Sequence, residues 1–139
     1  MKNSNGTSLP FLLTLTTGEL KATRSAVDFS LFISFTVPIE SLNGPFNICT
    51  ESLEVAIKKV LEEGKLTPKV VIAVDLFGLP ADFTKVKEVA DKYGLLVLED
   101  GAQGFGGEIN GKRACSFGDI ATTSFFPAKP LGCYGDGGA

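Results

Sequence analysis

Two short apolar segments, each preceded by an amphipathic one, constrain the fold of this chain more than any other feature. Residues 69–74 read KVVIAV and residues 95–98 read LLVL, which is typical of strands buried in a parallel sheet. Residues 52–63 and the segment between Asp82 and Gly94 carry apolar residues at helical spacing. The order helix, strand, helix, strand predicts an α/β fold with three layers, α/β/α, around a mainly parallel sheet.

Turn residues divide the remainder of the chain. Asp82 is a natural N-cap, and Gly64 and Gly94 provide helix ends. Asn110-Gly111 predicts a tight type I′ hairpin, and residues 120–126 read as a further strand that ends at a proline. Residues 1–45 show no clean periodicity, so we separate an N-terminal segment, 1–45, from an α/β region, 46–139.

The absence of histidine excludes several chemistries at once. Ser-His-Asp and Cys-His nucleophiles, imidazole acid–base catalysis and His-ligated metals are all removed, and we expect no metal site. Proton transfer must then use Lys, Asp, Glu, Tyr or Cys.

Charge, hydropathy and cysteine content indicate a cytoplasmic protein. The net charge is −3, from 13 basic and 16 acidic residues, with no basic patch to support a nucleic-acid partner. No apolar run approaches the roughly 20 residues that span a bilayer, so no membrane partner is expected. The three cysteines, at positions 49, 115 and 133, lack CxxC spacing, which favours a reducing compartment.

Candidate functional residues follow the last two strands. Ten of the 16 glycines lie in residues 101–139, as in loops that surround a ligand, although an ordinary loop-rich region has the same composition. Asp100 ends the second buried strand, at the edge where open parallel sheets bind ligands. The alternative for Asp100 is a turn cap, and Gln103 three residues later adds little by itself.

Lys129 gives these residues a chemical meaning. It lies between two prolines, which fix the backbone on both sides, and among Phe125, Phe126 and Leu131. Partial desolvation favours a neutral amine, and such an amine forms Schiff bases with aldehydes. A solvated loop lysine remains the alternative. A Schiff-base lysine with a strand-end carboxylate is the minimum arrangement for pyridoxal phosphate, and Ser124 is available to its phosphate.

Three stretches resemble the sugar aminotransferases of the DegT/DnrJ/EryC1/StrS family. They are residues 74–82, residues 98–106 and, most specifically, residues 123–139, TSFFPAKPLGCYGDGGA. The similarity is greatest to the branch that aminates UDP-linked keto sugars, including the UDP-2-acetamido-2-deoxy-3-oxo-glucuronate aminotransferases of surface-polysaccharide synthesis.

The resemblance implies a pyridoxal-phosphate-dependent aminotransferase of the type I fold, usually a homodimer. Lys129 would hold the cofactor and transfer protons, and Asp100 would pair with the pyridinium nitrogen. Gln103 would lie near the phenolic oxygen, and Ser124 would bind the phosphate. The amino donor would typically be glutamate, the acceptor a nucleotide-linked keto sugar. Family members that dehydrate the sugar replace the lysine, typically with histidine, so Lys129 favours transamination.

The N-terminal segment departs from the family pattern. Asn5-Gly6-Thr7 and the leucines after it resemble the family's Gly-Thr phosphate loop and its following helix, which would make Thr7 a second phosphate ligand. The ring-stacking aromatic could be Phe29, Phe32 or Phe35, and core packing is an alternative for each. We expect region 46–139 to be a partial large domain.

The chain also stops at a point that is mid-domain in the family, so we expect a truncated fragment. The alternative function is a non-catalytic remnant of such an enzyme. A Rossmann nucleotide-binding module is disfavoured, because residues 104–107, GFGG, do not supply GxGxxG before a helix.

Overall fold

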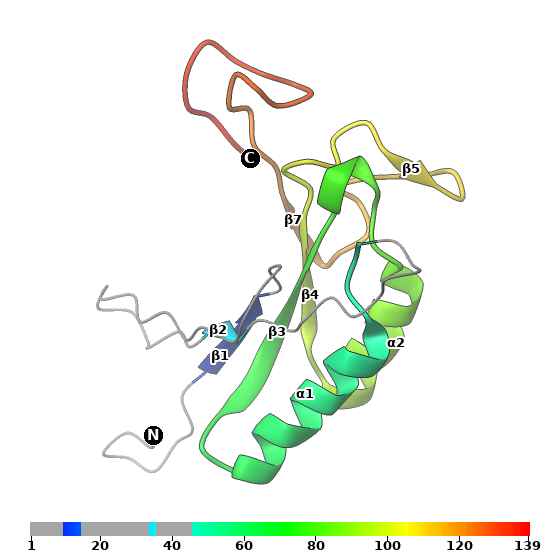
Figure 1. The fold of residues 1–139 in the computed structure, drawn as a ribbon, viewed down its shortest axis with the longest axis vertical. Coiled ribbons are helices and arrows are strands. Elements are labelled where there is room, and N and C mark those ends of the chain that lie inside the picture. Colours follow the sequence, from blue (N-terminus) through cyan, green and yellow to red (C-terminus); the bar gives the residue numbers. More distant parts are fainter. Residues whose placement is uncertain (1–9, 15–33, 36–45) are drawn as a thin grey trace.

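The structure is a computed structural model that describes residues 10–14, 34–35 and 46–139. Its centre is a sheet of five parallel strands in the order β2-β1-β3-β4-β7 (Figure 1). The strands are β1 Pro10–Thr14, β2 Ser34–Phe35, β3 Thr67–Val74, β4 Leu96–Asp100 and β7 Ile120–Thr122. A separate hairpin pairs β5 Glu108–Ile109 with β6 Lys112–Arg113. The predicted α/β class and parallel sheet are confirmed.

Two helices, α1 Thr50–Glu63 and α2 Phe83–Tyr93, lie on one face of this sheet (Figure 1). A short 3₁₀ turn, η1 Leu76–Gly78, follows β3. The core lies between helices and sheet and is formed by buried apolar side chains, including Leu53, Ile57, Val71, Ala73, Val86, Ala90 and Val97. On the opposite face, Leu96 and Ile120 are 56% and 62% exposed. In the part of the chain that the structure describes, the helical layer is therefore on one face only.

The predicted helix ends and hairpin turn are confirmed. The Asp82 carboxylate accepts a hydrogen bond from the backbone N–H of Lys85, 3.2 Å away, at the start of α2. Gly64 and Gly94 end the two helices in the left-handed region, with φ of 63° and 65°. Asn110 and Gly111 both have positive φ, 52° and 76°, as a type I′ turn requires.

The strand predicted over residues 120–126 is wrong in its length. The pairing with β4 begins at Ile120 and ends at Thr122. Residues 123–125 instead pair antiparallel with residues 137–139. The Thr123 N–H donates to Ala139 O at 2.8 Å, and the Phe125 N–H donates to Gly137 O at 2.7 Å. Residues 123–139 therefore form a loop that is closed at its base.

The helix expected after the Gly-Thr sequence is also wrong where it can be compared. Residues 10–14 form β1, whose extended backbone pairs with both β2 and β3. Thr7, Phe29 and Phe32 lie outside the described residues, and Phe35 belongs to β2. None of the helices in the described ranges is both long enough and apolar enough to cross a bilayer.

Candidate functional site

The loops that carry the candidate residues leave the same edge of the sheet. Strands β3, β4 and β7 are parallel neighbours, so their carboxyl ends lie together (Figure 1). Backbone hydrogen bonds join these ends: the Asp75 N–H donates to Asp100 O at 3.0 Å, and the Gly101 N–H donates to Thr122 O at 2.8 Å. This edge is where ligands bind in open parallel sheets.

Asp100 and Gln103 lie at the end of β4 and in the turn after it. Asp100 is half-buried, and its side chain points away from the helices, because it alternates with the fully buried Glu99. Its Oδ1 accepts the Ala102 N–H at 3.1 Å. Gln103 is exposed, and its Oε1 accepts the Phe77 N–H at 2.9 Å. The Gln103 side chain is therefore held against η1.

Ser124 and Lys129 belong to the closed loop that follows β7. Ser124 is half-buried, and its Oγ accepts the Phe126 N–H at 3.2 Å. Lys129 is half-buried too, and its backbone N–H donates to Phe126 O at 2.8 Å. Within the described ranges, no hydrogen bond or ion pair engages the Lys129 ammonium group.

Close packing fixes the shape of this loop. A Cβ added to Gly132 would lie 2.6 Å from Pro127 O, and one added to Gly138 would lie 2.8 Å from Thr123 O. The loop is also attached to the turn after β4, because Thr123 Oγ1 donates a hydrogen bond to Gly101 O at 3.3 Å. The structure thus carries Asp100, Gln103, Ser124 and Lys129 on two adjoining loops at one edge of the sheet.

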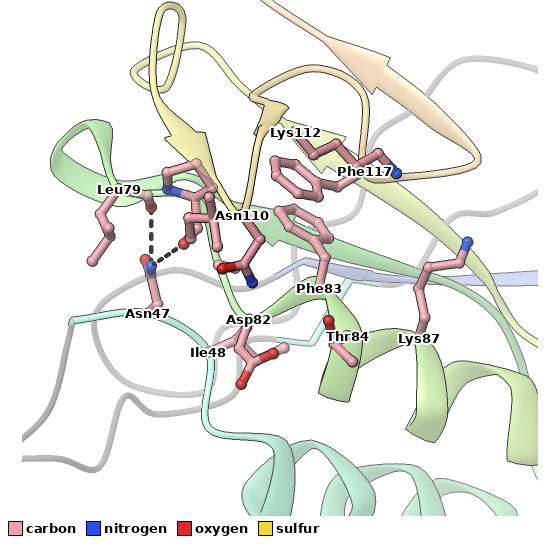
Figure 2. Close-up of a pocket in the computed structure, with 13 residues that line it drawn as sticks. Asn47, Ile48, Leu79, Asp82, Phe83, Thr84, Lys87, Asn110, Lys112 and Phe117 are labelled. Carbon is pink, nitrogen blue, oxygen red and sulfur yellow. Dashed lines mark hydrogen bonds between the residues drawn. The ribbon is translucent and has the colours of Figure 1, made fainter.

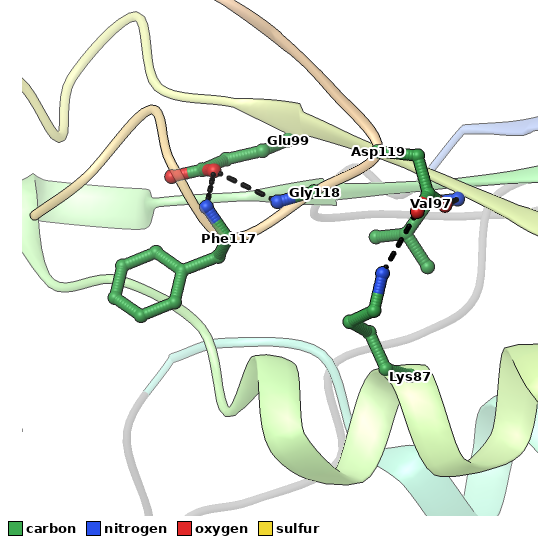
Figure 3. A network of polar contacts seen from close by, with 6 residues as sticks. All are labelled: Lys87, Val97, Glu99, Phe117, Gly118 and Asp119. Carbon is green, nitrogen blue, oxygen red and sulfur yellow. Dashed lines mark hydrogen bonds and ion pairs between the residues drawn. The ribbon is translucent and has the colours of Figure 1, made fainter. Parts of the chain in front are cut away.

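Two buried carboxyl groups, which the sequence analysis missed, lie beneath these loops. Asp75 and Glu99 are each 0% exposed. Glu99 accepts hydrogen bonds from the backbone N–H groups of Cys115, Phe117 and Gly118. Figure 3 shows the bonds from Phe117 and Gly118, which are 2.7 and 3.1 Å long. Burial first, and then the neighbouring Glu99 carboxylate, raise the pKa of Asp75 to about 7.

One sequence signal could have identified Glu99. Side chains of a strand alternate between its faces, so Glu99 shares the helix-covered face with Val97. An acidic residue in that position of a buried strand needs partners, because an unpaired buried carboxylate is costly.

A network anchored on α2 orients the entry to β7. Asp119 Oδ1 pairs with Lys87 Nζ at 2.9 Å, and its Oδ2 accepts the Val97 N–H at 2.8 Å (Figure 3). The Asp119 N–H also donates to Val97 O at 2.8 Å. Asp119 therefore fixes the position of the chain where β7 begins, and with it the start of the loop that carries Lys129.

A pocket of about 550 Å³ lies apart from the candidate residues, on the helix-covered side (Figure 2). The start of α2, the β5–β6 hairpin and the segment before α1 surround it. The rings of Phe83 and Phe117 stack in its wall at 5.1 Å, and Asn47 Nδ2 donates to Leu79 O at 3.0 Å. None of Asp100, Gln103, Ser124 and Lys129 lines this pocket.

Comparison with known proteins identifies the family. Residues 31–139 match the sequence profile of the DegT/DnrJ/EryC1/StrS aminotransferase family. The chain belongs to this family. The aminotransferases of the DegT/DnrJ/EryC1/StrS family depend on pyridoxal phosphate.

Individual relatives support the assignment to this family. A UDP-2-acetamido-2-deoxy-3-oxo-D-glucuronate aminotransferase of Pseudomonas aeruginosa is 54% identical over 81 residues, which are 57% of this chain and 23% of the relative. A UDP-N-acetyl-3-dehydro-alpha-D-glucosamine 3-aminotransferase of Acidithiobacillus ferrooxidans is 53% identical over 78 residues, 55% of this chain and 21% of the relative. The chain thus matches less than a quarter of the length of these curated relatives.

A solved structure gives the same result for the fold. A DegT/DnrJ/EryC1/StrS aminotransferase from Brucella abortus superposes with a TM-score of 0.75 and 34% identity, covering 94% of this chain and 34% of that one. The parallel sheet described above is therefore part of a type I aminotransferase fold.

The donor groups at the sheet edge suit the cofactor of this family. A pyridinium nitrogen needs a carboxylate, and Asp100 supplies a half-buried one. A phosphate needs a hydroxyl donor, which Ser124 has. An aldehyde needs an amine, and the Lys129 side chain has no partner among the described residues. The close-packed Gly132 and Gly138 leave the backbone of the lysine loop with little room for other conformations.

Proposed function

We propose that this chain carries the cofactor-binding strand ends and the Schiff-base lysine of an aminotransferase that acts on a nucleotide-linked keto sugar. The observation that carries the proposal is the placement of Asp100, Gln103, Ser124 and Lys129 on two hydrogen-bonded loops at the carboxyl edge of a parallel sheet. Family membership supports it.

The role proposed for each residue is the one that the resemblance to the family implies. The Lys129 amine would hold the cofactor through its aldehyde and would move a proton between cofactor and substrate carbon. The Asp100 carboxylate would pair with the pyridinium nitrogen and keep it protonated. The Ser124 hydroxyl would donate to the phosphate, and Gln103 would lie near the phenolic oxygen. Bound pyridoxal phosphate supplies the electron sink that stabilises a substrate carbanion.

The substrate class is proposed from the relatives. The Pseudomonas and Acidithiobacillus proteins are both named for amino transfer on UDP-linked sugars that carry a 3-oxo group. We infer a UDP-linked keto sugar as acceptor, with glutamate as donor, in surface-polysaccharide synthesis. The active protein would be a homodimer in the cytoplasm, and the three free cysteines support a reducing compartment.

Borohydride trapping tests the proposal. The chain is mixed with pyridoxal phosphate and reduced, which fixes the cofactor covalently on the lysine that holds it, and peptide mass spectrometry then locates the label. We expect the label on Lys129 and its loss in Lys129→Ala. Lys112→Ala, an exposed lysine on β6, is the matched control and should label normally.

Cofactor affinity gives a second readout. Asp100→Asn removes the charge that pairs with the pyridinium and should raise the Kd for pyridoxal phosphate about tenfold or more. Labelling spread evenly over the lysines, or an unchanged Kd in Asp100→Asn, would overturn the assignment.

A further inference from the structure

The buried carboxyl groups of Asp75 and Glu99 have no part in the function proposed above. Asp75 directly follows β3, and Glu99 lies on β4 opposite Ala73. Both side chains lie on the helix-covered face, and both are 0% exposed. They therefore form a buried acidic pair beneath the loops that carry the cofactor residues.

Hydrogen bonding around the pair is complete except at one atom. Both oxygens of Glu99 accept backbone N–H groups, from Cys115 on one side and from Phe117 and Gly118 on the other. Asp75 Oδ1 accepts the Ala81 N–H at 3.3 Å. Asp75 Oδ2 is buried and has no donor among the described residues. A proton on Oδ2 turns this atom into a donor and removes one of two buried charges.

The surroundings of Asp75 favour that proton. The titratable groups that act on it are the Glu99 carboxylate, the Asp100 carboxylate and the thiol of Cys115. None of these three can become a cation, so none can compensate a second negative charge. Burial and Glu99 raise the pKa of Asp75 to about 7, which agrees with this geometry.

The turn after β4 is built directly on the Asp75 side chain. A Cβ on Gly104 would meet the Asp75 carboxyl group, and a Cβ on Gly101 would lie 3.8 Å from Asp75 Oδ2. Gln103 lies between these glycines and binds the Phe77 N–H, two residues after Asp75. The Asp75 N–H itself donates to Asp100 O.

We propose that Asp75 and Glu99 hold one proton between them and act as a positioning pair for Asp100 and Gln103. The roles of Asp100 and Gln103 rest on the proposed function, but the shared proton does not. When it leaves as the pH rises through neutrality, two adjacent carboxylates are buried under the turn, and the turn loses its fixed geometry. Cofactor binding should then weaken.

Carbon-13 NMR of the Asp and Glu side-chain carboxyl groups tests the shared proton without cofactor. We expect one Asp carboxyl to titrate near neutral pH, to disappear in Asp75→Asn, and to shift to lower pH in Glu99→Gln. The backbone amides of Phe77 and Gly104 should shift with the same midpoint. Asp91→Asn, at an exposed position of α2, should change none of these signals.

Three results would overturn the shared proton or its role in positioning. In the first, every Asp and Glu carboxyl titrates below about pH 5, as ordinary carboxyls do. In the second, a near-neutral titration survives in Asp75→Asn. In the third, the Phe77 and Gly104 amides do not follow the titration, so the pair does not position the turn.

The dependence of cofactor affinity on pH tests the link to function. Asn at position 75 keeps a donor toward Glu99 but cannot lose a proton. Relative to Asp75→Asn, the wild-type Kd for pyridoxal phosphate should rise about tenfold between pH 6.5 and 8.5. Because Lys129 is present in both proteins, its contribution to cofactor affinity cancels in this ratio.

These experiments distinguish the proposed function from the proposed role of Asp75 and Glu99. Identical pH profiles for wild type and Asp75→Asn would contradict the positioning role, even if Lys129 holds the cofactor. A failure of Lys129 labelling would contradict the proposed function and leave the NMR titration as the test of the shared proton. Asp75→Ala keeps neither donor nor acceptor, so the turn should lose its geometry. The amide chemical shifts of Phe77 and Gly104 should then move toward the values of an unstructured chain.

Discussion

At the scale of single residues, the turn after β4 depends on glycines that leave room for a carboxyl group. A Cβ on Gly104 would collide with Asp75 Oδ2 and would lie 2.5 Å from Asp75 Cβ. Real Cβ atoms do not approach other atoms so closely, and Asp75 is enclosed on all sides, so neither residue can yield.

Gly104→Ala should therefore destabilise the fold by about 1–3 kcal/mol, the usual cost of overpacking a core. The free energy of unfolding in urea measures this. Gly135→Ala is the matched control, because nothing lies within 4 Å of a Cβ there and it should change stability by less than about 0.5 kcal/mol. Equal effects of the two substitutions would contradict the enclosed carboxyl.

Asp75 also predicts how stability depends on pH. Its pKa is raised from 3.8 to about 7, so the folded state keeps a proton that the unfolded chain releases. Raising the pH from about 4 to 7 therefore lowers the free energy of unfolding, by at most about 1.4 kcal/mol per pH unit. Glu54 has the opposite effect on the pH dependence of stability. It acts mainly at lower pH than Asp75, because the hydrogen bond from Lys92 is the largest cause that lowers its pKa to about 2.

Urea unfolding of wild type and Asp75→Asn at pH 5 and pH 7 measures this contribution. Wild type should lose more stability than Asp75→Asn when the pH is raised from 5 to 7. A difference that is constant with pH would show that Asp75 has an ordinary pKa.

At the scale of elements, one side chain joins a helix and two strands. Asp119 accepts the buried Val97 N–H at the start of β4 and pairs with Lys87 of α2 before β7 begins (Figure 3). The Lys87 hydrogen bond is the main cause that lowers the pKa of Asp119. The two contacts differ in energy, because the ion pair is exposed to solvent and the Val97 N–H is not.

Asp119→Ala should cost about 1–3 kcal/mol, because it leaves the Val97 N–H without an acceptor. Lys87→Ala should cost less than about 1 kcal/mol, because it removes only an exposed ion pair. Chemical denaturation of both variants measures the difference, and hydrogen exchange at the Val97 amide locates it. An Asp119→Ala cost no larger than that of Lys87→Ala would assign the role to the ion pair instead.

The sequence predicted these elements where the signal is local. Asp82, Gly64, Gly94 and Asn110-Gly111 act through their own dihedral angles and nearby backbone groups, and each prediction was correct. β7 was predicted too long because residues 123–125 are extended either way, and the sequence pattern does not reveal that their partners are residues 137–139. The family resemblance, more than periodicity, selected Gln103 and Ser124 as candidates.

At the scale of the whole molecule, the two faces of the sheet differ in how they are covered. The helix-covered face holds the core, whereas Leu96 and Ile120 on the other face are largely exposed. Exposed apolar side chains on neighbouring strands promote association. The residues of this face alternate with the buried ones, so the sequence pattern of two apolar strands could not show which face the described helices cover.

We therefore expect concentration-dependent self-association of this chain, measured by sedimentation velocity. Leu96→Lys and Ile120→Lys should each reduce it by placing a charge on the open face. Val55→Lys is the control, because Val55 is equally exposed, at 65%, but lies on α1. If Val55→Lys reduced association as much, net charge and not this face would be the cause.

The closed base of the lysine loop bears on the order of folding. Thr123 and Ala139 are 16 positions apart, whereas Leu12 of β1 and its partner Val70 of β3 are 58 positions apart. Joining distant segments costs more chain entropy and slows their pairing. The loop that carries Lys129 can therefore close early, before β1 pairs with β3. The segment with the candidate lysine then takes its shape before β1 and β2 join the sheet.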